Sequence, residues 1–217
     1  MRQRSPYFLG LDLGQSQDPT ALALLEREDI ESAERDPVTF ERRMVNLYRI
    51  RGLKRLPLGT RYPDIVRQVN DILDVSTEGH STTVVVDATG VGAPVVDMLR
   101  EELRGKATLV PVIFTAGDTA RFDDGVHRVP KKDLVHGLLL EFEQGRLRVP
   151  DHPLRETLLG EFRTMRVKIT GENHAGYEAW RQGQHDDMVF AVALACWAAR
   201  RGAPKVQPGL CEPLLWT

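Results

Sequence analysis

Residues 82–87 read TTVVVD, and this stretch decides the fold class. Its β-branched residues are typical of a buried strand, and the strand ends at a carboxylate. A turn containing Gly90 and Gly92 follows, and residues 94–103 then carry apolar side chains at helical spacing. A strand, a tight turn and a helix in this order favour a parallel sheet that is covered by helices.

Upstream of this stretch, the sequence predicts three strands joined by short links. Residues 7–13 (YFLGLDL) and 20–26 (TALALLE) are apolar, and residues 44–50 (MVNLYRI) alternate between apolar and polar side chains. Short links favour antiparallel pairing of consecutive strands. Residues 27–44 are dense in charge, which predicts an exposed excursion, and Pro63 marks the first turn of a helix.

Downstream of residue 87, strand and helix patterns alternate. Strands are predicted at residues 109–114 and 146–149, and helices begin near Pro130, Pro153 and Asp186. The prediction is an α/β fold with a mixed sheet, in which three antiparallel strands precede parallel strands and helices cover both faces.

Residues 1–201 are predicted to form one domain, which suits a chain of 217 residues. Within it, residues 116–125 are predicted to be a loop and residues 168–184 a loop or hairpin, and residues 202–217 form a Pro-rich tail. Lys and Arg number 29 against 31 Asp and Glu. The resulting net charge of −2 excludes a globally basic nucleic-acid binder, but not a local basic groove.

The sequence also favours a soluble protein of a reducing compartment. Cys196 and Cys211 are the two cysteines, too few for a disulfide scaffold or a zinc cluster. The longest apolar run, residues 188–199, has 12 residues, whereas a membrane-spanning helix requires about 18. Asp12 interrupts the first apolar stretch too early for a signal peptide. We therefore expect a cytoplasmic protein with no membrane partner.

Four aspartates stand where apolar segments end or begin. Asp12 ends the first strand and Asp87 ends TTVVVD, while Asp186 and Asp187 open the last helix. Taken singly, each is explained as a turn former or a helix cap. If the segments are neighbours, however, the carboxylates converge and repel one another, and protons or cations must neutralise them. Oxygen ligands suit Mg²⁺ or Mn²⁺, and two such ions ~3.5–4 Å apart can hold both reacting oxygens of a phosphodiester displacement.

A stripe of small residues in the last helix supports this convergence. From Asp187, steps of about one turn lead to Ala191, Ala195 and then Ala198 or Ala199. Small side chains let the helix approach the sheet closely, which brings the acids at its start toward the acids at the strand ends. The helix N-terminus also favours negative charge.

Four stretches together resemble the nuclease domain of phage large terminase subunits, a branch of the RNase H-like group. They are GLDLGQSQDPTALALLE (10–26), VVVDATGVGAPVVDML (84–99), VPKKDLVHGLLLEFEQGRLRVP (129–150) and GQHDDMVFAVALACWA (183–198). The resemblance implies an RNase H-like domain and a metal-dependent endonuclease that cleaves DNA phosphodiester bonds with little sequence specificity. It also implies two Mg²⁺ or Mn²⁺ ions as cofactors.

The resemblance assigns roles to the aspartates. Asp12 would bridge both metals, Asp87 would hold one and Asp187 the other. Asp186 is the adjacent candidate, and Asp187 is preferred because it leads the small-residue stripe. His185 would contact phosphate or water, or is only a polar residue before a helix.

The same resemblance implies partners. DNA is the expected substrate, and a separate ATPase motor, a small terminase subunit and a portal would complete a viral DNA-packaging machine. The sequence contains no G-x-x-x-x-G-K-[ST] phosphate loop. We therefore expect a nuclease part that is excised or encoded separately, or a stand-alone nuclease, of phage or prophage origin and active in the cytoplasm of a bacterial host.

Three groups of basic residues are candidates for contacting DNA phosphates without reading bases. Alternatively, each group is an ordinary solvated face. The first group, within residues 41–61, comprises Arg42, Arg43, Arg49, Arg51, Lys54, Arg55 and Arg61. The second comprises Arg128, Lys131 and Lys132, and the third Arg163, Arg166 and Lys168.

Three other functions compete with this interpretation. A Holliday-junction resolvase of the same fold has a similar layout of acids, and a preference for four-way junctions would distinguish it. An actin-like or sugar-kinase ATPase also opens with a strand like GLDLG, but it needs a duplicated domain for which 217 residues leave no room. A catalytically silent assembly module is disfavoured because every expected acid is retained.

Overall fold

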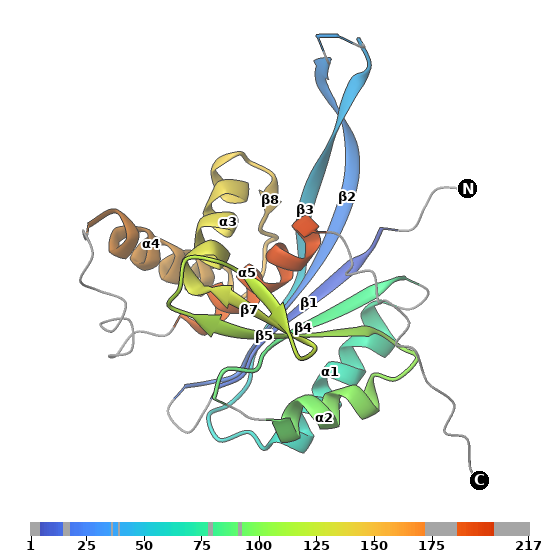
Figure 1. Ribbon diagram of the computed structural model, residues 1–217, viewed down its shortest axis with the longest axis vertical. Coiled ribbons are helices and arrows are strands. Elements are labelled where there is room, and N and C mark those ends of the chain that lie inside the picture. Colours follow the sequence, from blue (N-terminus) through green and yellow to red (C-terminus); the bar gives the residue numbers. More distant parts are fainter. Residues whose placement is uncertain are drawn as a thin grey trace.

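A mixed sheet of eight strands forms the centre of the molecule, in the order β6-β7-β5-β4-β1-β2-β3-β8 (Figure 1). This computed structural model describes residues 5–14, 18–35, 37–38, 40–77, 80–90, 93–171 and 186–201. The strands are β1 (Tyr7–Asp12), β2 (Ala21–Arg35), β3 (Arg42–Arg55), β4 (Thr82–Asp87), β5 (Thr108–Thr115), β6 (Arg121–Asp123), β7 (Val126–Pro130) and β8 (Leu147–Arg148). The helices are α1 (Tyr62–Ser76), α2 (Ala93–Glu102), α3 (Lys131–Glu143), α4 (Arg155–Gly171) and α5 (Asp187–Arg201).

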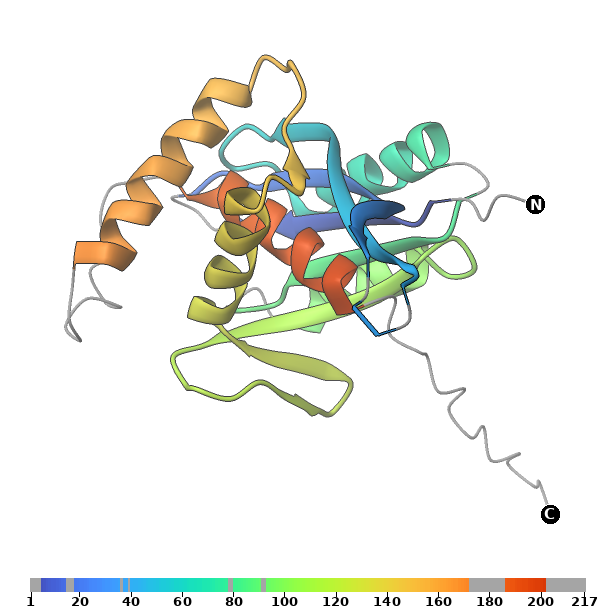
Figure 2. The same ribbon diagram turned by 90° about the horizontal axis from the view of Figure 1, so that it is seen from above.

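The antiparallel and parallel halves of the sheet meet at β1. Strand β1 pairs antiparallel with β2, which pairs antiparallel with β3. On its other side β1 pairs parallel with β4, and β4, β5 and β7 continue the parallel half. Helix α5 lies across one face with α3 and α4 beside it, and α1 and α2 cover the other face (Figure 2). The predicted fold class is therefore confirmed.

Side chains of the central strands alternate between two hydrophobic cores, one on each face. Phe8 and Val85 belong to the core beneath α5, whereas Leu9 belongs to the core beneath α1 and α2. Successive residues of a strand point to opposite faces. Asp12 and Asp87 have the same parity as Phe8 and Val85, so both carboxylates lie on the α5 face of the sheet.

Helix α5 packs against β1 at a distance that only a glycine permits. A Cβ placed on Gly10 would lie 1.9 Å from the carbonyl oxygen of Ala191 and 2.9 Å from the backbone nitrogen of Ala195. Both alanines are fully buried. The small-residue stripe is thus confirmed as the surface by which α5 approaches the sheet, and Gly10 is its counterpart on the strand.

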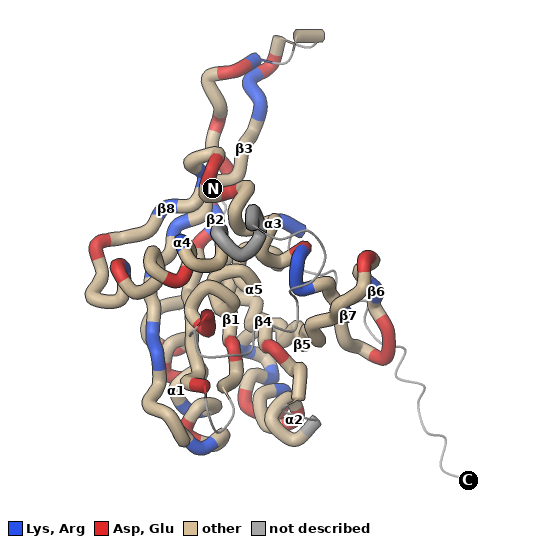
Figure 3. Tube along the Cα trace, turned by 90° about the vertical axis from the view of Figure 1, so that its left-hand side faces the viewer, with Lys and Arg blue, Asp and Glu red and all other residues tan. Residues whose placement is uncertain are grey.

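Residues 27–44 differ from the predicted excursion, because β2 and β3 continue through most of it as a long hairpin that projects from the body (Figure 1). Acidic and basic residues both line this hairpin (Figure 3). Arg42 Nη1 donates to Glu31 at 3.4 Å within this range, and nearer the body Arg49 Nε donates to Glu28 at 2.9 Å. The dense charge thus marks exposed, paired strands rather than a break in the sheet.

Secondary structure occupies part of two other predicted loops. Within 116–125, β6 begins, and Asp124 and Gly125 form a turn with positive φ values of 49° and 75°. An Asp-Gly pair suits such a hairpin turn, so the signal was present in the sequence. Helix α4 continues to Gly171, and residues 172–185 and 202–217 lie outside the described part of the chain. Within that part, no helix has the length and apolarity needed to cross a membrane.

Candidate active site

A row of residues crosses four neighbouring strands at one end of the sheet. Asp12 pairs in register with Ala21 on β2, and Ala21 pairs with Arg55 on β3. On the other side, the parallel register of β1 and β4 makes Asp87 the neighbour of Asp12. The row therefore places two carboxylates and one guanidinium on the face that α5 covers, with a small alanine between them.

Asp12 and Asp87 are an acidic pair with raised proton affinity. Burial raises the pKa of Asp12 well above its usual range, and repulsion from Asp87 and from the two aspartates at the start of α5 raises it further. Burial also raises the pKa of Asp87 to about 6. Lys131 lowers the pKa of both carboxyls. The pair thus requires a proton or a cation near neutral pH.

The turn after β4 fixes the carboxylate of Asp87. The backbone N–H of Thr89 donates to Asp87 Oδ1 at 2.8 Å, and this hydrogen bond opposes the rise in the pKa of Asp87. Thr89 Oγ1 in turn accepts from the backbone N–H of Phe114 at 2.7 Å. Asp87 is therefore held by the turn after β4, and Thr89 in turn anchors that turn to the backbone of β5.

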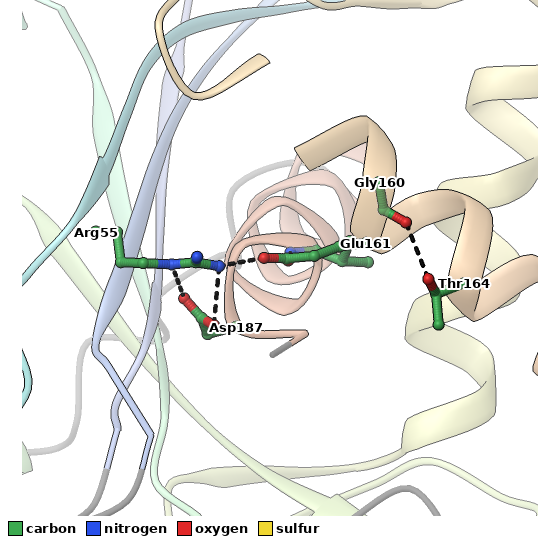
Figure 4. Close-up of polar contacts among 6 residues, drawn as sticks. Arg55, Gly160, Glu161, Thr164 and Asp187 are labelled. Carbon is green, nitrogen blue, oxygen red and sulfur yellow. Dashed lines mark hydrogen bonds and ion pairs between the residues drawn. The ribbon is translucent and has the colours of Figure 1, made fainter. Parts of the chain in front are cut away.

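Arg55 binds two buried acids at the other end of the row (Figure 4). Its Nε donates to Asp187 Oδ2 at 2.7 Å and its Nη2 to Oδ1 at 3.0 Å. Nη2 also donates to Glu161 on α4, whose other oxygen accepts from the Val189 N–H at 3.2 Å. The side chains of Asp187 and Glu161 are only 5% and 7% exposed. One guanidinium thus joins β3, α4 and the first turn of α5.

Glu161 is a fifth acid of this region, and it was not predicted as a site residue. Burial raises its pKa to about 7, and repulsion from Asp187 adds to the effect while Arg55 opposes it. A signal was available, because Glu161 lies between Leu158 and Met165 on the apolar face of α4. An acid on a buried helix face requires a partner.

Asp186 and Lys131 meet on the side of the site away from Arg55. Lys131 Nζ lies 4.0 Å from Asp186 Oδ2 and 4.1 Å from the ring centroid of Phe190. Lys131 was predicted only as a contact to DNA phosphates. In the fold it stands at the start of α3, beside the acids, where its charge also acts on Asp12 and Asp87.

The carboxylate donors of the site suit a hard divalent cation in chemistry and in charge. Burial raises the pKa of both Asp12 and Asp87, and repulsion from the neighbouring aspartates raises that of Asp12 further, as expected where a cation is the natural counter-charge. Among the described residues, no group of three His, Cys, Asp or Glu side chains is gathered closely enough to hold a metal ion. Both Asp187 oxygens accept from Arg55. Side chains would therefore have to adjust around a bound ion.

The other predicted DNA contacts are scattered. Arg128 and Arg163 are exposed on β7 and α4, and Lys132 forms an ion pair with Asp118. Of the first group, Arg42, Arg49 and Arg51 pair with glutamates across the hairpin, and Arg55 is turned inward. The side chains of Arg166 and Lys168, and the whole of His185, lie outside the part of the chain that the structure describes.

Comparison with solved structures identifies the architecture. A manganese-soaked structure of the human cytomegalovirus terminase nuclease domain matches with a TM-score of 0.51 and 12% identity, over 88% of this chain and 82% of that chain. A second structure of the same domain gives a TM-score of 0.50 and 14% identity, over 89% and 82%. The chain has the fold of a viral terminase nuclease domain.

A further similarity is weaker. The fowlpox virus Holliday junction resolvase matches with a TM-score of 0.38 and 8% identity, over 90% of this chain and 99% of that chain. No protein-family model and no curated protein matches this sequence. The match to the terminase nuclease domain in three dimensions supports the resemblance that the sequence predicted, although the sequence identity is only 12% and 14%.

Proposed function

We propose that this chain is a Mg²⁺- or Mn²⁺-dependent endonuclease that cleaves DNA phosphodiester bonds. The observation that carries the proposal is the pairing of Asp12 and Asp87 at the ends of neighbouring parallel strands, opposite the aspartates that open α5, within the fold of a terminase nuclease domain. Buried carboxylates that repel one another are unfavourable for stability alone, so their convergence favours a role in binding cations.

In this proposal Asp12, Asp87 and Asp187 hold two divalent ions, and Asp186 is the alternative to Asp187. Bound ions would activate water and neutralise charge on the reacting phosphate. A carboxylate has about four lone-pair positions, so Asp187 can accept from Arg55 and still bind a cation. Arg55 then fixes the direction of Asp187, as groups behind metal ligands commonly do.

The remaining residues of the site position charge. Glu161 holds Arg55 and the start of α5 together through its contacts with the guanidinium and with the Val189 N–H. Lys131 places a positive charge beside the acids, where it would attract the phosphate of a DNA strand and stabilise the negative charge that develops during cleavage.

A digestion assay tests the proposal directly. Linear duplex, supercoiled plasmid and a four-way junction are incubated with Mg²⁺, with Mn²⁺ and with EDTA. We expect cleavage of duplex and plasmid with either metal and none in EDTA. Robust cleavage in EDTA would contradict the proposed metal dependence. Cleavage confined to the four-way junction would indicate a junction-specific resolvase rather than an endonuclease of ordinary duplex DNA.

Comparison of two variants assigns the third ligand. Asp187→Asn should abolish cleavage and reduce the stabilisation of the protein by Mn²⁺, while Asp186→Asn should retain part of both. The reverse pattern would transfer the ligand role to Asp186. Melting temperature against Mn²⁺ concentration gives this result independently of catalysis.

The packaging context is part of the same proposal. DNA is the substrate of this chain, and an ATPase motor, a small terminase subunit and a portal would be supplied by other chains. Because the sequence has no phosphate loop, the purified chain should not hydrolyse ATP. ATP hydrolysis that persists through further purification would contradict the assignment of the ATPase activity to another chain.

A further inference from the structure

An open polar hollow of about 600 Å³ lies at the end of the sheet that carries the aspartates. The residues that line it come from the described parts of three links, namely those between β1 and β2 and between β3 and α1, and the turn after β4. Gly14 in its wall follows Asp12 by two residues along the chain, and Gly90 follows Asp87 by three. Residues that line the hollow therefore follow both strand-end acids directly along the chain.

The wall of this hollow combines exposed backbone with one cation and one aromatic ring. Gly59 and Gly90 contribute no side chains to the wall, and the space beside Gly59 is open, so a ligand can come close to the main chain there. Arg61 presents a guanidinium whose side chain is 81% exposed, and Tyr62 presents a ring beside it at the start of α1. Backbone, an arginine and an aromatic ring are the groups by which proteins hold a nucleic-acid strand without reading its sequence.

We propose that the hollow is a subsite for the DNA strand next to the bond that is cut, with Arg61 on a phosphate and Tyr62 against the adjoining sugar or base. This inference rests on the proposed endonuclease function and deepens it. A strand whose phosphate reaches Asp12 and Asp87 must continue away from them, and the hollow begins within a few residues of both. Asp18 also lines the hollow and carries the opposite charge, so the affinity for phosphate is concentrated at Arg61.

The chain offers a matched control for Arg61. Arg61 Nε lies 3.2 Å from Asp64 Oδ2, and Arg67 Nη1 lies 3.1 Å from Asp64 Oδ1. Both arginines thus pair with the same carboxylate near the start of α1, and both are well exposed. Only Arg61 lines the hollow. Replacing either one by alanine removes the same charge and the same type of ion pair, so a difference between the two variants reports the position of the charge.

The experiment measures binding of a fluorescent linear duplex of mixed sequence in an Asp12→Asn background, where the DNA stays intact. Arg61→Ala should weaken binding several-fold and reduce the slope of log K against log salt by about 0.7–0.9, the contribution of one phosphate contact. Tyr62→Ala should also weaken binding, because the contact with the adjoining sugar is lost. Arg67→Ala should leave both quantities near the unsubstituted values. In the cleaving protein, Arg61→Ala should raise KM with little change in kcat.

Equal effects of Arg61→Ala and Arg67→Ala, or an unchanged salt slope in Arg61→Ala, would overturn the subsite. That failure is distinct from failure of the proposed function, because the unsubstituted protein would still cleave DNA with Mg²⁺ or Mn²⁺. Absence of both cleavage and DNA binding in the unsubstituted protein would overturn both. Urea unfolding of the two arginine variants should give equal stabilities, which excludes a folding defect as the source of any difference.

Discussion

At Asp12, the stability of the fold favours an uncharged side chain, whereas the proposed metal site requires a carboxylate. The residue ends an apolar strand, and burial together with three neighbouring carboxylates raises its pKa. A leucine or asparagine would cost less free energy there in the absence of a cation. Such acids are visible in a sequence, because they interrupt an apolar pattern. The role of Arg55 as the partner of two buried acids is not visible, because these acids lie 106 and 132 residues further along the chain.

The first prediction concerns Asp12→Asn, which removes one charge and nearly preserves shape. Cleavage should be abolished, while the metal-free protein should unfold at an equal or slightly higher free energy, by about 1 kcal/mol or less. Asp71→Asn on the exposed face of α1 is the control and should change neither property. A clear loss of stability in metal-free Asp12→Asn, measured by urea unfolding, would make Asp12 a structural residue.

A second prediction separates the two ion pairs of β3. Arg55→Ala leaves two buried carboxylates without their cation, and we expect the free energy of unfolding to fall by about 3 kcal/mol. Arg51→Ala removes a cross-strand pair whose arginine is 47% exposed, and the expected loss is about 0–1 kcal/mol. Denaturant unfolding of both variants checks the difference. Similar losses would mean that the Arg55 contacts contribute no more than a surface pair.

At the scale of elements, the sequence predicted strands β1 to β5, strand β8 and helices α1 to α5, but it missed β6 and β7 and did not show how far several elements extend. The strand TTVVVD was predicted with its observed bounds, Thr82–Asp87, because β-branched residues and flanking turns both limit it. Strands β2 and β3 extend well beyond their apolar parts, because cross-strand pairs such as Arg42 with Glu31 stabilise the hairpin where no core exists. That pairing depends on register, which local charge does not reveal.

The third prediction tests the contact between β1 and α5. Gly10→Ala places a methyl group against the backbone of Ala191, which cannot retract as a flexible side chain would. We expect a loss of about 3 kcal/mol in the free energy of unfolding, together with weaker metal binding because the start of α5 is displaced. In Gly52→Ala the nearest atom is Leu24 Cβ at 3.9 Å, so this control should be neutral or slightly stabilising. Equal stability of the two variants would show that α5 can move away from β1 without a loss in the free energy of unfolding.

At the scale of the whole molecule, the acids link folding to both protons and metal. In EDTA the folded protein binds protons that the unfolded chain does not, since the pKa of Asp87 is about 6 and that of Glu161 about 7. Unfolded carboxyls titrate near pH 4. Raised carboxyl pKa values in the folded state mean that stability is present at low pH and is lost as pH rises.

The fourth prediction follows from this linkage. In EDTA, the contribution of these carboxyls to the free energy of unfolding should fall as pH rises from about 4 to about 7, by on the order of 1 kcal/mol per unit of pKa shift. A metal that binds only the folded protein at a hundredfold excess over Kd adds about 2.7 kcal/mol. Because the ion requires ionised carboxylates, its contribution should grow with pH, so the curves with and without Mn²⁺ diverge across the window. Urea unfolding at a series of pH values measures both curves. In Asp12→Asn, the difference in the free energy of unfolding with and without Mn²⁺ should be smaller. Parallel curves would mean that proton and metal do not compete for the same carboxylates, and the ligand set would have to be sought elsewhere in the fold.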